Sequence, residues 1–499
     1  MTRLTKTKYV TYLRCPKALW LSVNKPELAA DDSQAESRIE TGKRVGELAK
    51  GLLGPYTDIT IRKEDGSLDI KRMAVKTLDC IVRGDRVLAE AAFLSGDNDE
   101  VYCAVDLLEN SGAGFNIYEV KSTTGDHLEN YYDDIAYQKY VLESGCIPVN
   151  RTYLVHINSK YVLEGDLDIH GLFEIKDVTD EIQDAYEAVK ENVKKAFDVL
   201  GYRNEPAMDL CKEHCLTAGD CPFWKYCTKH VPEPSVFDLY RMQFGKKLQF
   251  YHRDVVTFEQ LKHEKLNKIQ KMQVDCTLNG ENRIDAEGIR DFMRSLSYPL
   301  YFLDFETMQL AIPEYQGTKP YQQLPFQYSL HYIEHEGGPL MHKEFLGISG
   351  EDPRRACAER LCQDIPMNVC TIAYNKTFEC GCLKDLAKAF PDLAVHLLNI
   401  RDHIVDLLTP FQSGMYYVPA MGGSFSIKSV LPAMFPDDPS LDYHNLEGDV
   451  HNGSEAMNIF PLIKDMKPEE QLKARRSLLE YCKLDTYAMV KVWQKLLEQ

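Results

Sequence analysis

An apolar run near residue 300 carries two carboxylates on alternate residues, and this pattern limits the fold more than any other feature of the chain. The segment PLYFLDFETM places Asp304 and Glu306 inside a strand-like stretch. Residues two apart on a strand point to the same face. Burying two carboxylates on one face is costly unless a cation or hydrogen-bond donors compensate them. Either this strand ends at the surface, or the chain builds a cation site beside it.

Two later segments carry further carboxylates. TIAYNKTFECGCL predicts an apolar strand that ends at Tyr374 and a helix that starts near Glu379. LLEYCKLDTYAMVKVW predicts a helix with Tyr481 and Asp485 four residues apart, on one face. Four carboxylates gathered from the strand and the two helices would hold two Mg²⁺ or Mn²⁺ ions about 4 Å apart, as in-line phosphoryl displacement requires. Tyr481 would then orient the attacking water.

A second carboxylate set lies earlier, in VYCAVDLLENSGAGFNIYEVKS. Val101–Leu108 and Phe115–Val120 predict two strands, and the Gly- and Asn-containing loop between them favours a hairpin. Glu119 and Lys121 share one strand face, and the hairpin can bring Asp106 beside them. Carboxylates bind Mg²⁺ or Mn²⁺ through oxygen, and a lysine can stabilise developing charge or orient a water. The alternative is an exposed Glu–Lys pair on a strand.

The helix predicted after this hairpin, in YYDDIAYQKYVLESG, presents Asp134 and Gln138 on one face. Gln138 could form a hydrogen bond near the metal or a phosphate, or simply be solvated. Further along, Thr152–His156 predicts another strand and residues 181–200 a long amphipathic helix.

The chain has 15 cysteines, and four of them lie within 17 residues, in CKEHCLTAGDCPFWKYC. In a reducing compartment such a group indicates a metal or an iron–sulfur centre rather than disulfides. A four-cysteine set is either Cys211 with Cys215, Cys221 and Cys227, or the last three with Cys15 near the N-terminus. The spacing alone does not choose between them, and buried apolar thiols are the plain alternative.

Charge and hydropathy narrow the class of protein. The formal net charge is -18, which argues against a protein that coats DNA through a general basic surface. A local strip, Lys262, Lys265, Lys268 and Lys271, has helical spacing and is either a solvated helix face or a nucleic-acid contact. No apolar run of about 18 residues and no secretory signal pattern is seen, so we expect a cytoplasmic protein that is not in a membrane.

Length and breaks in pattern predict the domain organisation. A chain of 499 residues exceeds the size of one core. A Pro-rich break, VPEP, follows the cysteine segment, and residues 235–297 show helical periodicity with few strand signals. We expect domains at 1–231 and 298–499 joined by a helical connector at 232–297, with both large parts mixed α and β.

Residues 1–231 resemble the RecB-like PD-(D/E)XK nucleases, a restriction-endonuclease-like fold, of the iron–sulfur type used in CRISPR adaptation and in helicase–nuclease repair enzymes. The resemblance is carried by RCPKALW, Asp106, the EVK motif, Gln138 and the last three cysteines of the cluster. It implies a catalytic metal at Asp106 and Glu119 assisted by Lys121 and Gln138. It also implies a [4Fe-4S] cluster, with Zn²⁺ as the alternative, on four residues: Cys15, Cys215, Cys221 and Cys227.

Two positions depart from that family. A metal-binding His often follows a Gly in an early helix, and here Gly46 is followed by Glu47. The family's Gln is usually followed four residues on by Tyr, and here that position is Leu142. Glu47 either substitutes for the His or the site lacks that ligand.

Residues 298–499 resemble the DEDD exonucleases, which are DnaQ-like and have the RNase H fold, in the branch with a tyrosine in the last motif. The match implies metal ligands at Asp304, Glu306, Glu379 and Asp485, with Tyr481 catalytic; the second motif usually has Asp where Glu379 stands. Asp406, in IVDLL, has either a site-shaping or a structural role. The whole chain resembles a family of poorly characterised bacterial proteins that join these two modules.

Each of two loops in the C-terminal part has two alternative roles. IPEYQGTKPYQQLPFQYSLH either lines a substrate groove or is a Pro-rich loop before a strand at Phe326–His331. In GGSFSIKSVLP, three polar residues (Ser424, Ser426 and Lys428) either face phosphates or belong to a plain loop before a helix.

Together these patterns predict a Mg²⁺- or Mn²⁺-dependent nuclease, most plausibly an exonuclease acting on DNA in repair or in defence against foreign DNA. Two alternatives stay open. One is a ribonuclease, because the RNase H-like fold serves both polymers. The other is a nucleic-acid-binding scaffold with decayed sites, which the missing His, the Glu at 379 and the acidic charge favour.

Overall fold

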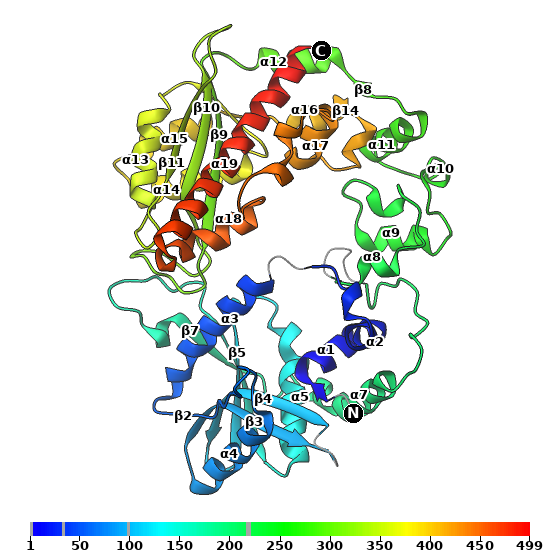
Figure 1. Cartoon of the computed structure of the whole chain (residues 1–499), viewed down its shortest axis with the longest axis vertical. Coiled ribbons are helices and arrows are strands. Elements are labelled where there is room, and N and C mark those ends of the chain that lie inside the picture. The colour runs from blue at the N-terminus through cyan, green and yellow to red at the C-terminus, as the bar shows by residue number, and fades with distance from the viewer. Residues whose placement is uncertain (1–2, 32–34, 97–99, 216–220) are drawn as a thin grey trace. The chain divides into compact units, whose positions relative to one another are not determined.

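A computed structural model describes residues 3–31, 35–96, 100–215 and 221–499. The protein is mixed α/β and forms two compact units (Figure 1). The first unit comprises Met1–Lys229 with Leu310–Tyr321, and the second comprises His230–Gln309 with Gln322–Gln499. The expected connector, 232–297, therefore lies within the second unit. Residues 310–321, placed in the C-terminal domain by the sequence, pack in the first unit.

A sheet of seven strands forms the centre of the first unit in the described residues. Its order is β2-β3-β4-β5-β6-β7, and the short β1 pairs with β4. The hairpin predicted around residue 112 is confirmed, because β4 and β5 pair antiparallel, while β5 and β6 are parallel. The strands are β1 Leu4–Thr5, β2 Thr57–Asp58, β3 Val87–Ser95, β4 Val101–Asn110, β5 Phe115–Lys121, β6 Val149–Ile157 and β7 Phe173–Asp177.

Helices cover both faces of this sheet. The larger core, which includes Leu19, Met73, Tyr137 and Val193, joins one face to α1, α2, α4, α5 and α7. The smaller core, which includes Val45 and Ala49, joins α3 to the other face. The helices are α1 Lys6–Arg14, α2 Pro16–Asn24, α3 Ala35–Ala49, α4 Ile70–Arg83, α5 Tyr132–Ser144, α6 Ile169–Leu172, α7 Gln183–Leu200 and α8 Trp224–Cys227.

The second unit is built on a five-stranded mixed sheet within the described residues, in the order β11-β10-β9-β12-β13. Strand β9 is central: it pairs antiparallel with β10 and parallel with β12. Its odd-numbered residues, such as Leu303 and Phe305, pack towards α13, α14 and α15. Its even-numbered residues face α19, where Phe302 meets Trp493 with ring centroids 5.7 Å apart. Asp304 and Glu306 therefore point to the α19 side.

From β9 to the C-terminus, strands come first and helices dominate towards the end, as the sequence predicts. The main strands are β9 Leu300–Gln309, β10 Gln323–Ile333, β11 Met341–Leu346, β12 Cys370–Ala373 and β13 Ile404–Asp406. The helices between and after them are α13 Arg354–Asp364, α14 Thr377–Ala389, α15 Ala394–Asp402, α16 Thr409–Gln412, α17 Ile427–Met434, α18 Gly453–Ile459 and α19 Pro468–Leu497. Figure 1 shows the long α19 running across the sheet.

The connector is helical, as its periodicity predicts, and has a small core of its own around Phe250, Phe258 and Val274. Its helices are α9 Phe244–Tyr251, α10 Phe258–Leu261, α11 Lys268–Asn279 and α12 Ala286–Arg294, and β8 Arg283–Ile284 pairs with β14 Tyr416–Tyr417. The expectation of one helical lysine strip is wrong. Asn267 caps α11, so Lys262 and Lys265 lie in the link before that helix.

Among the described residues, no helix is both long enough and apolar enough to cross a membrane.

Candidate metal centres

The first carboxylate centre lies where β4 and β5 separate. Their described pairing runs from Asn110↔Phe115 to Leu107↔Tyr118, and Asp106 and Glu119 lie just beyond its end. The Asp106 Oδ2 atom accepts a hydrogen bond of 2.7 Å from the Val120 backbone N–H. Both acidic side chains therefore come from backbones fixed by the sheet, at the point where the sheet opens.

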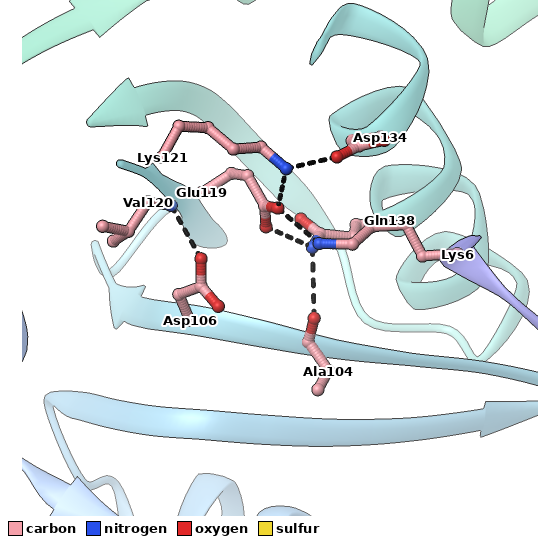
Figure 2. A network of polar contacts seen from close by, with 8 residues as sticks. All are labelled: Lys6, Ala104, Asp106, Glu119, Val120, Lys121, Asp134 and Gln138. Atoms are coloured by element: carbon pink, nitrogen blue, oxygen red, sulfur yellow. Dashed lines mark hydrogen bonds and ion pairs between the residues drawn. The ribbon is translucent and has the colours of Figure 1, made fainter. Parts of the chain in front are cut away.

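Glu119 is 1% exposed and is held from several sides (Figure 2). The Gln138 Nε2 atom donates 2.5 Å to its Oε2 atom and 3.1 Å to the carbonyl oxygen of Ala104. The Lys121 ammonium lies 2.8 Å from Oε1, and the Lys6 ammonium forms an ion pair with the same atom. The structure thus brings together all the residues predicted for this centre and shows that Gln138 positions the glutamate.

The pKa values of Asp106 and Glu119 differ widely. Burial and the nearby Glu119 charge raise the pKa of Asp106 to about 7. Burial acts to raise the pKa of Glu119 as well, but Lys121 and Lys6 lower it to about 2. Lys121 also contacts Asp134, the residue one turn before Gln138. Glu119 is therefore ionised at neutral pH, and Asp106 loses its proton readily when a cation is added.

Sequence reasoning missed Lys6 and Glu90 in this centre. Glu90 lies within the apolar strand β3, and its backbone is in the left-handed region, at φ 57°. This conformation is unfavourable for residues other than glycine, and such residues are found most often at functional sites. Glu90 raises the pKa of Asp106, while burial raises its own. The sequence signal that could have identified Glu90 is that it is the one charged residue in the apolar segment VLAEAAFL. Glu47 instead forms an ion pair with Lys50, at 2.7 Å.

A cavity of about 620 Å³ extends from this centre along α1. Three of its four charged lining residues are basic, and the fourth is Asp134. Helix α1 supplies one face of it, from Lys6 to Arg14. At its far end the cavity reaches the cysteine segment. The lining residues that matter here are Lys6, Arg14, Cys15, Lys121, His214 and Cys221.

The structure gathers four cysteines from the two ends of the first unit. Burial, with smaller contributions from Cys221, Cys15 and Cys215, raises the pKa of the Cys227 thiol to about 11. All four are partly buried and free of disulfides. Cys15 also interacts electrostatically with Cys215 and Cys221, and Cys211 with Cys215. Cys15 therefore lies close enough to the last three cysteines to affect their charge; residues 216–220 lie outside the described residues.

The second centre unites the carboxylates predicted for the C-terminal part. Asp304, Glu306 and Cys482 each offer one ligand atom within 4.8 Å of the others. Tyr443 donates a hydrogen bond of 2.6 Å to Asp485 on α19. Asn375 has φ 66°, which Asn tolerates, and so turns the chain from β12 into α14 just before Glu379.

Burial, with repulsion between some of the acids added to it, sets the protonation of this centre. Burial and the Asp485, Glu306 and Glu379 carboxylates raise the pKa of Asp304 well above its ordinary value. Burial raises the pKa of Glu379 to about 8, and its Oε2 atom has no hydrogen-bond partner in the described residues. Burial raises the pKa of Asp485 to about 6, although Tyr443, Lys428 and Tyr481 lower it. Such a set lacks positive charge.

Three neighbours were missed or undecided. Tyr443 was missed, and so was Cys482, whose Sγ atom lies 3.7 Å from the Asp304 Oδ2 atom. Asp406 is structural: its Oδ1 atom accepts backbone hydrogen bonds of 2.9 Å from Asn375 and 3.0 Å from Leu408.

The comparisons with known proteins cover parts of the chain. Residues 301–426, which include Asp304, Glu306 and Glu379, match a family described as a domain of unknown function, DUF2779. No curated protein matches the chain. One solved structure, described as "Crystal structure of SSO0001", is 13% identical; the match covers 46% of this chain and 88% of that one, with a TM-score of 0.25.

We predict that ionisation of the second centre destabilises the protein when metal is absent. The Asp485 pKa is about 6, above its ordinary value of 3.8, so its contribution to stability is complete below pH 3.8 and is lost as the pH rises through 6. In EDTA, the unfolding temperature should fall from pH 4.5 to 7.5 more steeply for the wild type than for Asp485→Asn.

Thermal unfolding followed by circular dichroism measures this difference. Asp402→Asn, which removes an exposed carboxylate paired with Arg401, should follow the wild type. Adding Mn²⁺ should raise the wild-type unfolding temperature more at pH 7.5 than at pH 5, because cations bind ionised carboxylates. Parallel pH curves for wild type and Asp485→Asn would contradict the prediction.

Proposed function

We propose that this protein is a metal-dependent nuclease with two separate phosphodiester-cleaving centres, one in each unit. The observation that carries the proposal is the second centre. It assembles four carboxylates from β9, α14 and α19, three of them buried and Asp304 partly buried, and leaves them short of positive charge. When these acids are ionised they need bound cations, and carboxylate oxygens are the ligands that Mg²⁺ and Mn²⁺ prefer.

In the second centre, Asp304, Glu306, Glu379 and Asp485 would hold the cations. These ions would supply Lewis acidity and lower the pKa of a bound water. Tyr481 is 4% exposed, lies against Asp485, and is suited to orient that water. The central mixed sheet, with the carboxylate strand in its middle, supports assignment to the RNase H-like DEDD exonucleases.

In the first centre, Asp106 and Glu119 would bind one cation. Gln138 fixes the Glu119 carboxylate, and Lys121 is placed to stabilise negative charge on a phosphate or to orient a water. The β4–β5 hairpin followed by α5 supports the PD-(D/E)XK assignment of this unit. Glu90 stands close enough to affect Asp106 and is the nearest candidate for the missing early ligand.

The basic cavity beside the first centre suggests which polymer form enters it. Lys6, Arg14, Lys121 and His214 line one continuous space, which reaches the two lysines paired with Glu119. A phosphate backbone is attracted to such a lining, and the single α1 face suits one strand better than a duplex. We therefore infer that a single nucleic-acid strand, most plausibly of DNA, approaches the first centre along α1.

The cysteine group would hold a [4Fe-4S] cluster, with Zn²⁺ as the alternative. Burial raises the thiol pKa values of Cys15, Cys215 and Cys227, the charge of Cys221 acts on all three, and none of the four forms a disulfide. Thiolates so placed are stable when a metal centre takes their charge. Cys15 stands at the N-cap of α2, so the cluster would join the start of the chain to the segment around Cys227.

We predict that two single substitutions separate the activities. Asp304→Asn should lower the activity of the second centre at least about 100-fold, more than the 10- to 100-fold typical of a residue that only supports a ligand, and Asp106→Asn should do the same for the first. The double variant should lose metal-dependent cleavage. Release of nucleotides from labelled single- and double-stranded DNA in Mg²⁺ or Mn²⁺ measures both.

Asp402→Asn serves as the control with unchanged cleavage. Matched RNA oligomers in the same assay decide between a deoxyribonuclease and a ribonuclease. Binding without turnover in either metal would instead support a non-cleaving scaffold and would count against the proposal.

The cysteine assignment gives a prediction of its own. Cys221→Ser should abolish the iron content and the visible absorption of anaerobically purified protein, because it removes one of the four ligands. Cys211→Ser, four residues before Cys215 but outside the proposed ligand set, should retain both. Equal loss in the two variants would refute the choice of Cys15 over Cys211. A colourless wild type with one zinc ion per chain would establish the zinc alternative.

A further inference from the structure

A single lysine stands over the second centre and has no part in the metal chemistry proposed above. The Lys428 ammonium lies 5.0 Å from the ring centroid of Tyr443 and 5.1 Å from that of Tyr481. It donates a hydrogen bond of 3.2 Å to the carbonyl oxygen of His451. Its side chain remains exposed. It is thus a cation held in a defined place and open to solvent on one side.

The loop that carries Lys428 is tightly constrained. Gly423 has φ 78°, and a Cβ there would lie 2.4 Å from the backbone oxygen of Asp238, so only glycine fits. The Tyr374 hydroxyl donates 2.7 Å to the carbonyl oxygen of Phe425. Ser426 caps α17, and Lys428 is the second residue of that helix. The loop therefore fixes the direction from which the ammonium approaches the centre.

The charge of Lys428 acts on the carboxylates themselves. It acts on Glu306 and on Asp485, and its single positive charge cannot balance four carboxylates. Once two divalent cations occupy the centre, their four charges balance those of the four carboxylates. Lys428 then no longer faces net negative charge and is free to attract another anion.

We propose that Lys428 forms the anion subsite of the second centre and binds a phosphodiester group of the nucleic-acid strand being cut. This inference rests on the proposed nuclease function. A phosphodiester carries one negative charge. A metal centre that is already neutral does not compensate this charge, but the single positive charge of Lys428 does. Ser426 and Ser429, whose Oγ atoms are 3.0 Å apart, flank Lys428 in sequence at the start of α17 and offer further hydroxyl donors.

A purely structural role predicts different behaviour. If Lys428 only offsets the empty carboxylates, its removal affects metal binding and leaves recognition of the strand unchanged. If it binds phosphate, its removal lowers kcat/KM for the nucleic acid. It does not weaken metal binding, because the lost ammonium repels the metal ions rather than attracting them. The two roles therefore separate in measurements made with and without nucleic acid.

The test compares Lys428→Gln with Lys491→Gln, both in an Asp106→Asn background that silences the first centre. Lys491 is a matched control because its ammonium also rests on a ring, 5.2 Å from the centroid of Phe435, outside the carboxylate group. At saturating Mn²⁺, Lys428→Gln should lower kcat/KM for DNA roughly 10- to 100-fold, as expected for loss of a charged hydrogen bond, and Lys491→Gln should leave it unchanged. Mn²⁺ titration without DNA should show no weaker binding in Lys428→Gln.

Oligonucleotides with one neutral methylphosphonate linkage, moved one position at a time, locate the contact. At one position the neutral linkage should slow the wild type by a similar factor and have little further effect on Lys428→Gln. Unchanged kcat/KM in Lys428→Gln, or additive effects at every linkage, would overturn the subsite while leaving the nuclease function intact. A parent protein that cleaves nothing would instead overturn the function itself.

Discussion

Burial of a group of carboxylates, to which their mutual repulsion adds, is the constraint that organises the second unit. Strand β9 is apolar on one face and carries Asp304 and Glu306 between apolar residues on the other, so an ordinary apolar helix cannot cover all of that second face. Helix α19 meets this need, because it brings Trp493 near its C-terminal end and Tyr481 near its middle. The fold concentrates charge where a cation can relieve it, and stability and cation binding become linked.

The two centres handle the same electrostatic problem in different ways. In the first, Lys6 and Lys121 lie against Glu119 and keep it charged. In the second, the acids are more numerous and Lys428 reaches them from an exposed position. The first centre is therefore largely balanced before any ion arrives, whereas the second depends on added cations for its balance. Their demands for metal should differ for that reason.

Sequence reasoning found the parts of each centre that local periodicity determines. The two-residue spacing in DFE and EVK places side chains on one strand face, and the four-residue spacing of Tyr481 and Asp485 does so on a helix. It missed Lys6 and Tyr443, which reach the centres only through long-range packing. The lysine strip failed for a local reason: the Asn267 cap ends the assumed helical continuity. Residues 310–321 pack in the first unit through contacts that no spacing records, such as the Tyr321 hydroxyl on the carbonyl oxygen of Ser122.

The cysteine group and the first centre share one cavity, and this has a mechanical consequence. Cys15 and Cys221 line its far end, while Lys6 and Lys121 line the end at the carboxylates. Helix α1 spans the distance between them and begins beside Glu119. A metal centre on the cysteines would hold the end of α1 in place through Cys15, and so would fix Lys6 at its start. Such a metal centre would thus support the geometry of a site that it does not touch.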